Sequence, residues 1–305
     1  MKGKITTAIA LLFSATSFAQ INMADSTVKT IAYWDKNEKQ EYSITADKFK
    51  LKGADTISRE NIKYEIQITV LDSTANSYTI EWFYKNFSIN TDNAFKKKIA
   101  SITQDMKVVF KTDEVGGFVE VVNWKEVRDY IKKMTDGIKN EFSDKPEMVK
   151  IINHIAATFS TKESIESVST KDIRQFHTFH GSQYKLSEVL KGQQKVPNIY
   201  GTEPFDSYSS LYLDEINDKD NNYILRASQS IDEKQLLDAT FNYLTKLAQS
   251  MKVDPPKRED IKEMKNETLT SSRIHGSGWV IYSVQTTTVT ADNSTNIEER
   301  VIEIK

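Results

Sequence analysis

Histidine is the side chain best suited to proton transfer or metal binding here, and the sequence contains 4 of them. His177 and His180 are spaced to share one face of a helix, where they could hold a metal ion. A catalytic zinc site also needs a third ligand and a general base, and the chain has no HExxH segment. Histidine is favoured at helix C-termini, and Gly181 follows directly. We therefore expect two partly exposed polar residues at a helix C-terminus and no metal.

Other patterns that could support catalysis have simpler explanations. Residues 276–278 read Gly-Ser-Gly, but a nucleophile elbow reads G-x-S-x-G between a strand and a helix, so we expect a turn. Acidic pairs at 113–114 and 298–299 could do acid–base chemistry, yet a turn and a mixed-polarity strand favour solvated surface. The glycines number 10 and are scattered, which excludes a phosphate-cradling loop. We predict no catalytic residue and no cofactor.

An aromatic stripe is the most suggestive candidate binding feature. Tyrosine, tryptophan and isoleucine alternate with polar residues along two neighbouring segments. Ordinary core packing against helices would explain the stripe. The alternative is a concave, aromatic-lined sheet that holds an apolar ligand beneath a helical lid. The candidate ligand-binding residues are Tyr64, Ile66, Ile68, Tyr78, Ile80, Trp82 and Tyr84.

Three short segments contain Asp, then Ser or Thr, then Thr or an apolar residue. They resemble the O-glycosylation acceptor that some Gram-negative bacteria use on exported proteins. The resemblance implies modification at Ser26, Thr56 and Ser73. Turn chemistry, in which Asp and Ser cap tight turns, is the alternative explanation.

The first residues have the pattern of a secretory signal peptide. Lys2 and Lys4 precede a short apolar stretch at 5–13, and Ser17-Phe18-Ala19 places small residues before a cleavage site. The apolar stretch is shorter than the roughly 20 residues needed to span a bilayer. We expect residues 1–19 to be removed and the mature chain, 20–305, to be periplasmic, at the cell surface or extracellular.

Composition excludes several functional classes. The chain has 0 cysteines, which rules out disulfides, thiolate metal sites, cysteine nucleophiles and a lipid anchor on cysteine. The formal net charge is -2, so nucleic-acid binding lacks its main electrostatic driving force. Hydrophobic residues make up 38% of the chain, as in folded proteins.

Period-two alternation predicts antiparallel strands on both sides of a helical middle. Helical spacing of apolar residues predicts helices between 92 and 104, between 123 and 177, and over 233–251. Asn123 followed by Glu126 resembles a capping box. A phase change in the strand over 40–51 suggests a bulge near 46–48, and 181–206 reads as an irregular connection.

This order of elements indicates an α+β fold. We expect a curved, half-barrel-like antiparallel sheet packed against a central helical cluster and one later helix. The mature chain is predicted to be a single domain, with a possible division into 20–180 and 181–305.

The segment from Tyr64 to Tyr84, YEIQITVLDSTANSYTIEWFY, resembles exported proteins of unknown function from Gram-negative bacteria, as does GSGWVIYSVQTTT at 276–288. The organisation is similar to the half-barrel of periplasmic lipoprotein carriers. That resemblance implies a lipid- or lipopeptide-binding role and transfers no residue. The long helical insert from 123 to 180 departs from the carriers.

The sequence favours a non-enzymatic binding protein for an apolar or amphipathic ligand such as a lipid or lipopeptide. One alternative is a structural or interaction protein of the envelope with a protein partner. A third is a hydrolase without a recognisable motif. Nucleic acid is not expected as a partner, and no membrane span is expected after removal of the leader.

Overall fold

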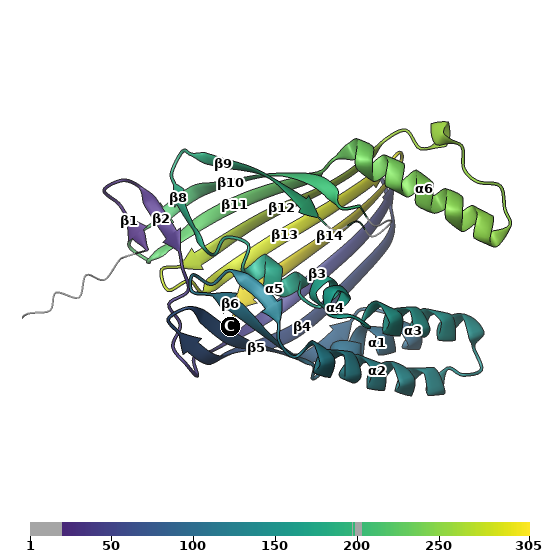
Figure 1. The fold of residues 1–305 in the computed structure, drawn as a ribbon, viewed down its shortest axis with the longest axis horizontal. Coiled ribbons are helices and arrows are strands. Elements are labelled where there is room, and N and C mark those ends of the chain that lie inside the picture. Colours follow the sequence, from purple (N-terminus) through teal and green to yellow (C-terminus); the bar gives the residue numbers. More distant parts are fainter. Residues whose placement is uncertain (1–19, 197, 199–202) are drawn as a thin grey trace, which may run out of the picture.

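The computed structural model describes residues 20–196, 198 and 203–305. They form an α+β fold dominated by one large, curved antiparallel sheet, which confirms the predicted class (Figure 1). The predicted leader, 1–19, lies outside the described residues. No helix in the described ranges has the length and apolar character that a membrane crossing requires.

The large sheet has eleven strands, and both halves of the chain contribute to it. Neighbouring strands follow the order β7 (Phe118–Val121), β6 (Lys107–Asp113), β5 (Ser77–Ile89), β4 (Asp55–Thr74), β3 (Lys39–Lys52), β14 (Ser294–Ile304), β13 (Val280–Ala291), β12 (Met264–His275), β11 (Asn222–Ile231), β10 (Phe205–Asn217) and β9 (Val189–Val196). The first five come from residues before 181 and the last six from residues after it. β3 pairs with β14 and joins the two groups.

The helices gather mainly at the concave face and at one end of the sheet (Figure 1). They are α1 (Ala94–Ala100) with a short 3-10 turn at Ser101–Thr103, α2 (Trp124–Glu141), α3 (Pro146–Thr158), α4 (Lys162–Val168), α5 (Lys171–Phe176) and α6 (Glu233–Met251); a second 3-10 turn covers Arg258–Asp260. The predicted helical middle and later helix are confirmed. α5 lies against the concave face, and α6 packs on β10 and β12.

A second, three-stranded sheet closes the opposite end. It consists of β1 (Ile21–Asn22), β2 (Thr27–Thr30) and β8 (Ser182–Lys185). Gln20, which begins the described chain, is buried beside it: its side-chain amide donates to the Ile31 carbonyl and accepts from the Tyr223 hydroxyl at 3.0 Å. This sheet therefore fastens the start of the chain to the core.

The bulge expected at 46–48 is wrong. β3 stays in register with β4 from Lys39 to Lys50, and the shift comes between Lys50 and Leu51. Tyr42 and Ile44 are buried on the concave side, whereas Phe49 lies on the opposite face beside Arg59. The change of phase in the sequence therefore marks the place where the concave face of β3 becomes polar.

The capping box expected at the start of α2 is also wrong. Asn123 is the N-cap residue, but its side chain makes no capping bond. Its amide oxygen accepts from the Val109 backbone amide at 2.8 Å, and its amide nitrogen donates to the Lys107 carbonyl at 3.0 Å. The Asn123 side chain instead pairs with the backbone of β6 beyond the end of β7. It lies within reach of β6 because only two residues separate β7 from α2.

The sequence predicts an irregular connection over 181–206, but the residues described there include β8, β9 and the start of β10, while 197 and 199–202 lie outside the described residues. β9 is the last strand of the sheet and is exposed over almost all its length. A strand that is solvated on both faces lacks an alternating apolar pattern, so local periodicity does not predict β9.

Candidate functional site

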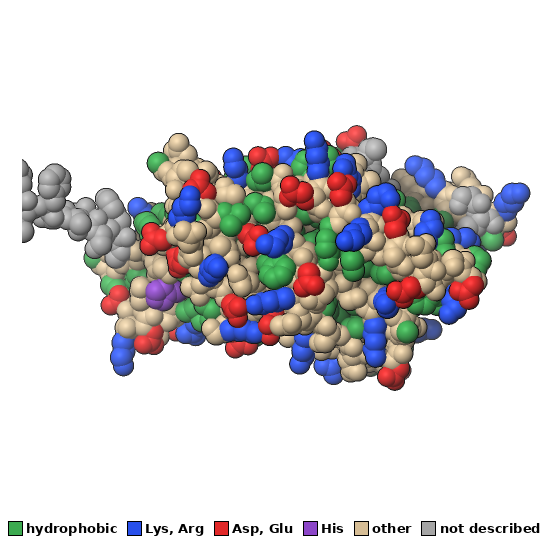
Figure 2. Space-filling view, turned by 90° about the horizontal axis from the view of Figure 1, so that it is seen from below, with side chains coloured by type: hydrophobic (Ala, Val, Ile, Leu, Met, Phe, Trp, Pro, Cys, Tyr) green, Lys and Arg blue, Asp and Glu red, His purple; other side chains and the backbone are tan. Residues whose placement is uncertain are grey.

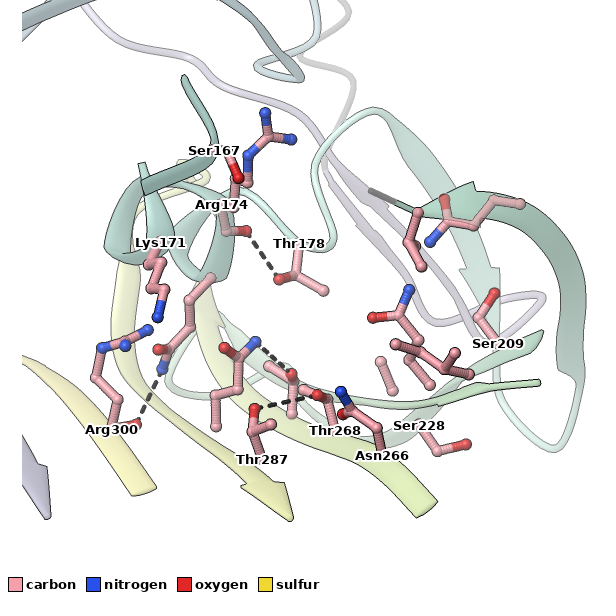
Figure 3. A pocket seen from close by; sticks show the side chains of 18 of the residues that line it. Ser167, Lys171, Arg174, Thr178, Ser209, Ser228, Asn266, Thr268, Thr287 and Arg300 are labelled. Carbon is pink, nitrogen blue, oxygen red and sulfur yellow. Dashed lines mark hydrogen bonds between the residues drawn. The ribbon is translucent and has the colours of Figure 1, made fainter. Parts of the chain in front are cut away.

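The concave face holds an open cleft of about 860 Å³ beside α5 (Figure 3). Its floor is formed by β10 to β14, its walls by α4 and α5 on one side and β9 on the other. The volume falls in the range typical of small-molecule sites. A second hollow of about 330 Å³ shares Thr287 and Glu298 with it and continues toward β3 and β4.

One side of the cleft is aliphatic. Leu211 on β10 lies directly opposite Ala227 on β11, and both border the main core. Val196 and Ile231 lie beyond the Ser209–Gln229 pair, next to a smaller apolar cluster formed by Phe205, Leu236 and Met264. We call Val196, Leu211, Ala227 and Ile231 the aliphatic strip.

The floor is polar, and strand register aligns its side chains. We call the aligned set Ser209, Gln229, Thr268, Thr287 and Glu298 the polar row. Each member lies directly opposite the next on the neighbouring strand, from β10 to β14. The Thr268 and Thr287 hydroxyls hydrogen-bond to each other at 3.1 Å, as Figure 3 shows. Strands lie about 4.8 Å apart, so the row presents polar groups at that interval across the sheet.

A buried ion pair separates the cleft from the core. The Arg300 guanidinium lies 3.0 Å from the Asp172 carboxylate of α5, and both side chains are more than nine-tenths buried. Asp172 also accepts hydrogen bonds from the Tyr64 hydroxyl at 2.7 Å and the Tyr84 hydroxyl at 3.3 Å. A second Arg300 nitrogen contacts Glu298. These contacts fix α5 to three strands and hold Arg300 at the edge of the cleft.

The electrostatics of this network keep the phenols protonated. Burial raises the pKa of Tyr64 well above its usual value, and the negative charge of Asp172 adds to the effect. Tyr84 is shifted in the same direction for the same reasons. Both hydroxyls therefore act as donors to Asp172, which is a structural role.

Gln175 forms part of the helical wall. Its side-chain amide donates to the Ser283 hydroxyl and to the Arg300 carbonyl, both at 3.1 Å. Its amide oxygen is buried and accepts no hydrogen bond from the described residues. Lys171 and Arg174 lie on either side of it in α5 and also border the cleft. Figure 3 shows the Lys171 amine near Arg300, while the Arg174 guanidinium points away from the strands of the floor.

All seven residues predicted to bind ligand lie in the main hydrophobic core. Phe176 of α5 packs edge-on against Trp82, with ring centroids 5.6 Å apart, and against Tyr42 at 5.5 Å. The chain itself therefore covers this half of the concave face, and none of the seven lines the clefts described above. Contact of these seven residues with a ligand stays a prediction. The open cleft lies on a neighbouring part of the concave face, over β9 to β14.

The expectation that His177 and His180 are partly exposed is wrong, because both are buried and fasten the end of α5 to two hairpin turns. The His177 Nδ1 lies 2.7 Å from the Gly116 carbonyl, and the His180 Nε2 lies 2.8 Å from the Gly278 carbonyl. Burial lowers the pKa of His177 well below its usual value and that of His180 to about 4. Among the described residues no cluster of three or more His, Cys, Asp or Glu could hold a metal ion.

The remaining sequence candidates lie at turns or on strands. The expectation of solvated surface at 298–299 holds for the exposed Glu299 but is wrong for Glu298, which is half-buried, contacts Arg300 and lines the cleft. Residues 276–278 form the turn between β12 and β13. Asp113 accepts hydrogen bonds from the backbone amides of Val115 and Gly117, as a turn-capping residue does. The possible glycosylation residues differ in access: Thr56 is exposed, while Ser26 and Ser73 are half-buried. Their modification stays a prediction.

The polar row was missed because its members are scattered over 209–298 and only strand pairing brings them together. One pattern could have indicated it. The QTTT segment at 285–288 places Gln285 and Thr287 on the concave face of a strand whose earlier inward residues are buried. Polar residues on an inward face are the unusual feature, since core positions are normally apolar.

No protein-family model matches this chain, and no curated protein matches it. The chain is similar to a solved structure described as "Lipid-protein interactions in lipovitellin". The TM-score is 0.40 and the identity 11%, over 89% of this chain and 25% of that one. The chain thus spans about a quarter of that protein's length. A superposition this loose carries no argument about ligand or mechanism.

Proposed function

We propose that this chain is an exported, non-enzymatic binding protein for an amphipathic ligand, which occupies the cleft beside α5. The observation that supports it most directly is the juxtaposition of two surfaces in one hollow. The aliphatic strip lies along β9 to β11, and the polar row crosses the floor to β14. A ligand with an apolar chain and a polar group would satisfy both.

The proposed export rests on the leader pattern of residues 1–19. Gln20 is held in the fold by its side-chain amide and by its backbone carbonyl, which accepts from the Lys29 backbone amide at 2.8 Å, so the described contacts of Gln20 are compatible with a mature chain that starts there. The non-enzymatic role is supported by the structural hydrogen bonds of His177, His180 and Tyr64.

A matched pair of variants on β13 tests the site. Thr287 lines the cleft, whereas the adjacent Thr288 points to the opposite face of the sheet. We expect Thr287→Trp to weaken binding of 11-(dansylamino)undecanoic acid at least tenfold, because the indole fills the cleft. Thr288→Trp should bind like the unmodified chain. Fluorescence titration measures both affinities, and native mass spectrometry of the purified protein detects any retained lipid.

Loss of binding in both variants, or in neither, would contradict the cleft as the site. A chain that binds no amphipathic probe at all would contradict the function itself. The envelope interaction protein with a protein partner would then be the better hypothesis.

A further inference from the structure

We infer that the polar part of the ligand is polyhydroxylated, a sugar unit or short glycan, and that it lies across the strands along the polar row. This inference rests on the proposed function and names the class of head group. It follows from which polar groups the cleft offers, how they are spaced and how their charges are already neutralised.

The polar row is built mainly from neutral groups that both donate and accept hydrogen bonds. Ser209, Thr268 and Thr287 contribute hydroxyls, and Gln229 contributes an amide. Gln285 adds a second amide, which donates to the Thr270 hydroxyl at 3.0 Å. Sugar hydroxyls likewise donate and accept, so each can pair with any of these side chains. A fatty chain alone would cover these groups and leave their remaining hydrogen-bonding capacity unused.

The row also has the right direction and extent for a short chain of sugars. Its five members occupy successive strands from β10 to β14, so four inter-strand steps of about 4.8 Å span about 19 Å. A ligand that lies across the strands would meet a hydroxyl or amide on each strand from β10 to β13 and the Glu298 carboxylate on β14. At one end it would reach the aliphatic strip, which is where an attached acyl chain would lie.

Charge in the cleft is largely compensated within the protein. Glu298 contacts Arg300, which also pairs with Asp172. Lys195 pairs with Asp206 at 2.7 Å. A strongly charged head group would therefore find few free counter-charges along the floor, whereas a neutral sugar needs none.

Two features of the helical wall bear on whether the head group is neutral or acidic. The Gln175 amide oxygen is buried at the wall and accepts no hydrogen bond from the described residues, so a ligand hydroxyl reaching this end would supply a donor. The Arg174 guanidinium stacks over the Phe118 ring at 4.8 Å. Lys171 is then the cation best placed to attract an acidic head group, which makes such a ligand the competing outcome.

The test compares probes that share one alkyl chain and differ in head group. They are dodecyl maltoside, dodecylphosphocholine and laurate, with maltose as the chain-free sugar, all below their micelle-forming concentrations and measured by isothermal titration calorimetry. We expect dodecyl maltoside to bind at least tenfold more tightly than laurate or dodecylphosphocholine. Free maltose should bind more weakly than dodecyl maltoside, because it leaves the aliphatic strip uncovered.

The double variant Thr268→Val/Thr287→Val removes two row hydroxyls while keeping side-chain shape. These hydroxyls bond to each other, so removing both leaves no unpaired partner. We expect about a tenfold loss for dodecyl maltoside and no change for laurate. The control Thr286→Val/Thr288→Val makes the same change on the opposite face of β13 and should alter neither affinity.

The outcomes separate this inference from the function on which it rests. Equal affinity for the three alkyl probes, or tightest binding of laurate, overturns the sugar head group and leaves amphipathic binding intact. Maltose binding as tightly as dodecyl maltoside supports the sugar and overturns the amphipathic ligand. Failure of every probe to bind overturns both.

Discussion

At the scale of single residues, His177 and His180 show how burial selects a role for a versatile side chain. Their ring centroids lie 5.0 Å apart, which is close enough for two imidazoles to share a metal ion or a proton. Each ring nitrogen that makes a hydrogen bond, however, meets a backbone carbonyl, and Trp34 packs beside both rings. Two protonated imidazoles could not be solvated there, so the folded protein holds both neutral.

This predicts a loss of stability in mild acid. Because the folded pKa of each ring is depressed, the unfolded chain binds more protons between the ordinary value of 6.5 and about 4. Stability is therefore complete above pH 6.5 and falls as the pH drops toward 4. His180 alone should contribute a loss of about 2 kcal/mol at pH 5 relative to pH 8. Urea denaturation at several pH values measures this dependence.

The exposed His154 supplies the control. His154→Gln should leave the pH dependence unchanged, while His180→Gln should lower stability at pH 8 and flatten the decline between pH 6.5 and 4. Direct observation of a protonated His180 ring at pH 6 by nitrogen NMR would contradict the explanation, whatever the variants do.

At the scale of elements, the turn between β12 and β13 connects several parts of the fold. The Gly278 carbonyl receives the hydrogen bond from His180, and the neighbouring Ser277 carbonyl accepts from the Tyr33 backbone amide at 3.2 Å. Gly278 has a φ of +86°, and a Cβ there would lie 2.4 Å from the Ile31 carbonyl oxygen. Backbone lies on both sides of the contact, so a side chain cannot be accommodated by rotamer change.

We expect Gly278→Ala to destabilise the protein by about 2 kcal/mol or more, from the strained backbone and the displaced strand connection. Gly137→Ala is the matched control, because Gly137 lies within α2 and a Cβ there meets nothing within 4 Å. It should stabilise by roughly 0.5–1 kcal/mol through helix propensity. Thermal denaturation of both variants gives the comparison, and equal effects of the two substitutions would refute the packing argument.

Local periodicity was sufficient for most elements but not for the site. The helices over 124–158 and 233–251 followed from apolar residues at helical spacing, and the hairpin of β4 and β5 from alternation. Strand order depends on pairing between distant segments, such as β3 with β14, which no local pattern encodes. The polar row depends on that order, and the exposed strand β9 lacked a pattern altogether. The sequence alone therefore could not predict the cleft, although the polar residues at inward positions of its strands could be recognised.

At the scale of the whole molecule, the concave face is divided between stability and binding. The β1–β2–β8 sheet and α6 lie at opposite ends of the large sheet (Figure 1). Toward the β1–β2–β8 end the concave face is filled by α5 and the aromatic core, and away from that end lies the open, polar cleft. The boundary runs through Arg300, which faces Asp172 on one side and the cleft on the other. The face of the molecule seen in Figure 2 mixes both signs of charge, which agrees with the small net charge of -2.

The same architecture predicts that 20–180 and 181–305 do not fold independently. β3 and β14 pair along eleven residue positions and join strands from the two segments into one sheet. In a fragment ending at 180, Asp172 would lose Arg300, and Gln175 would lose Ser283, so buried polar groups would be left without partners. We therefore expect calorimetry of 20–305 to show one cooperative unfolding transition, and the fragment 20–180 to lack near-ultraviolet circular dichroism. Two separate transitions, or a fragment with fixed aromatic packing, would show that the ion pair and the shared sheet are not what holds the halves together.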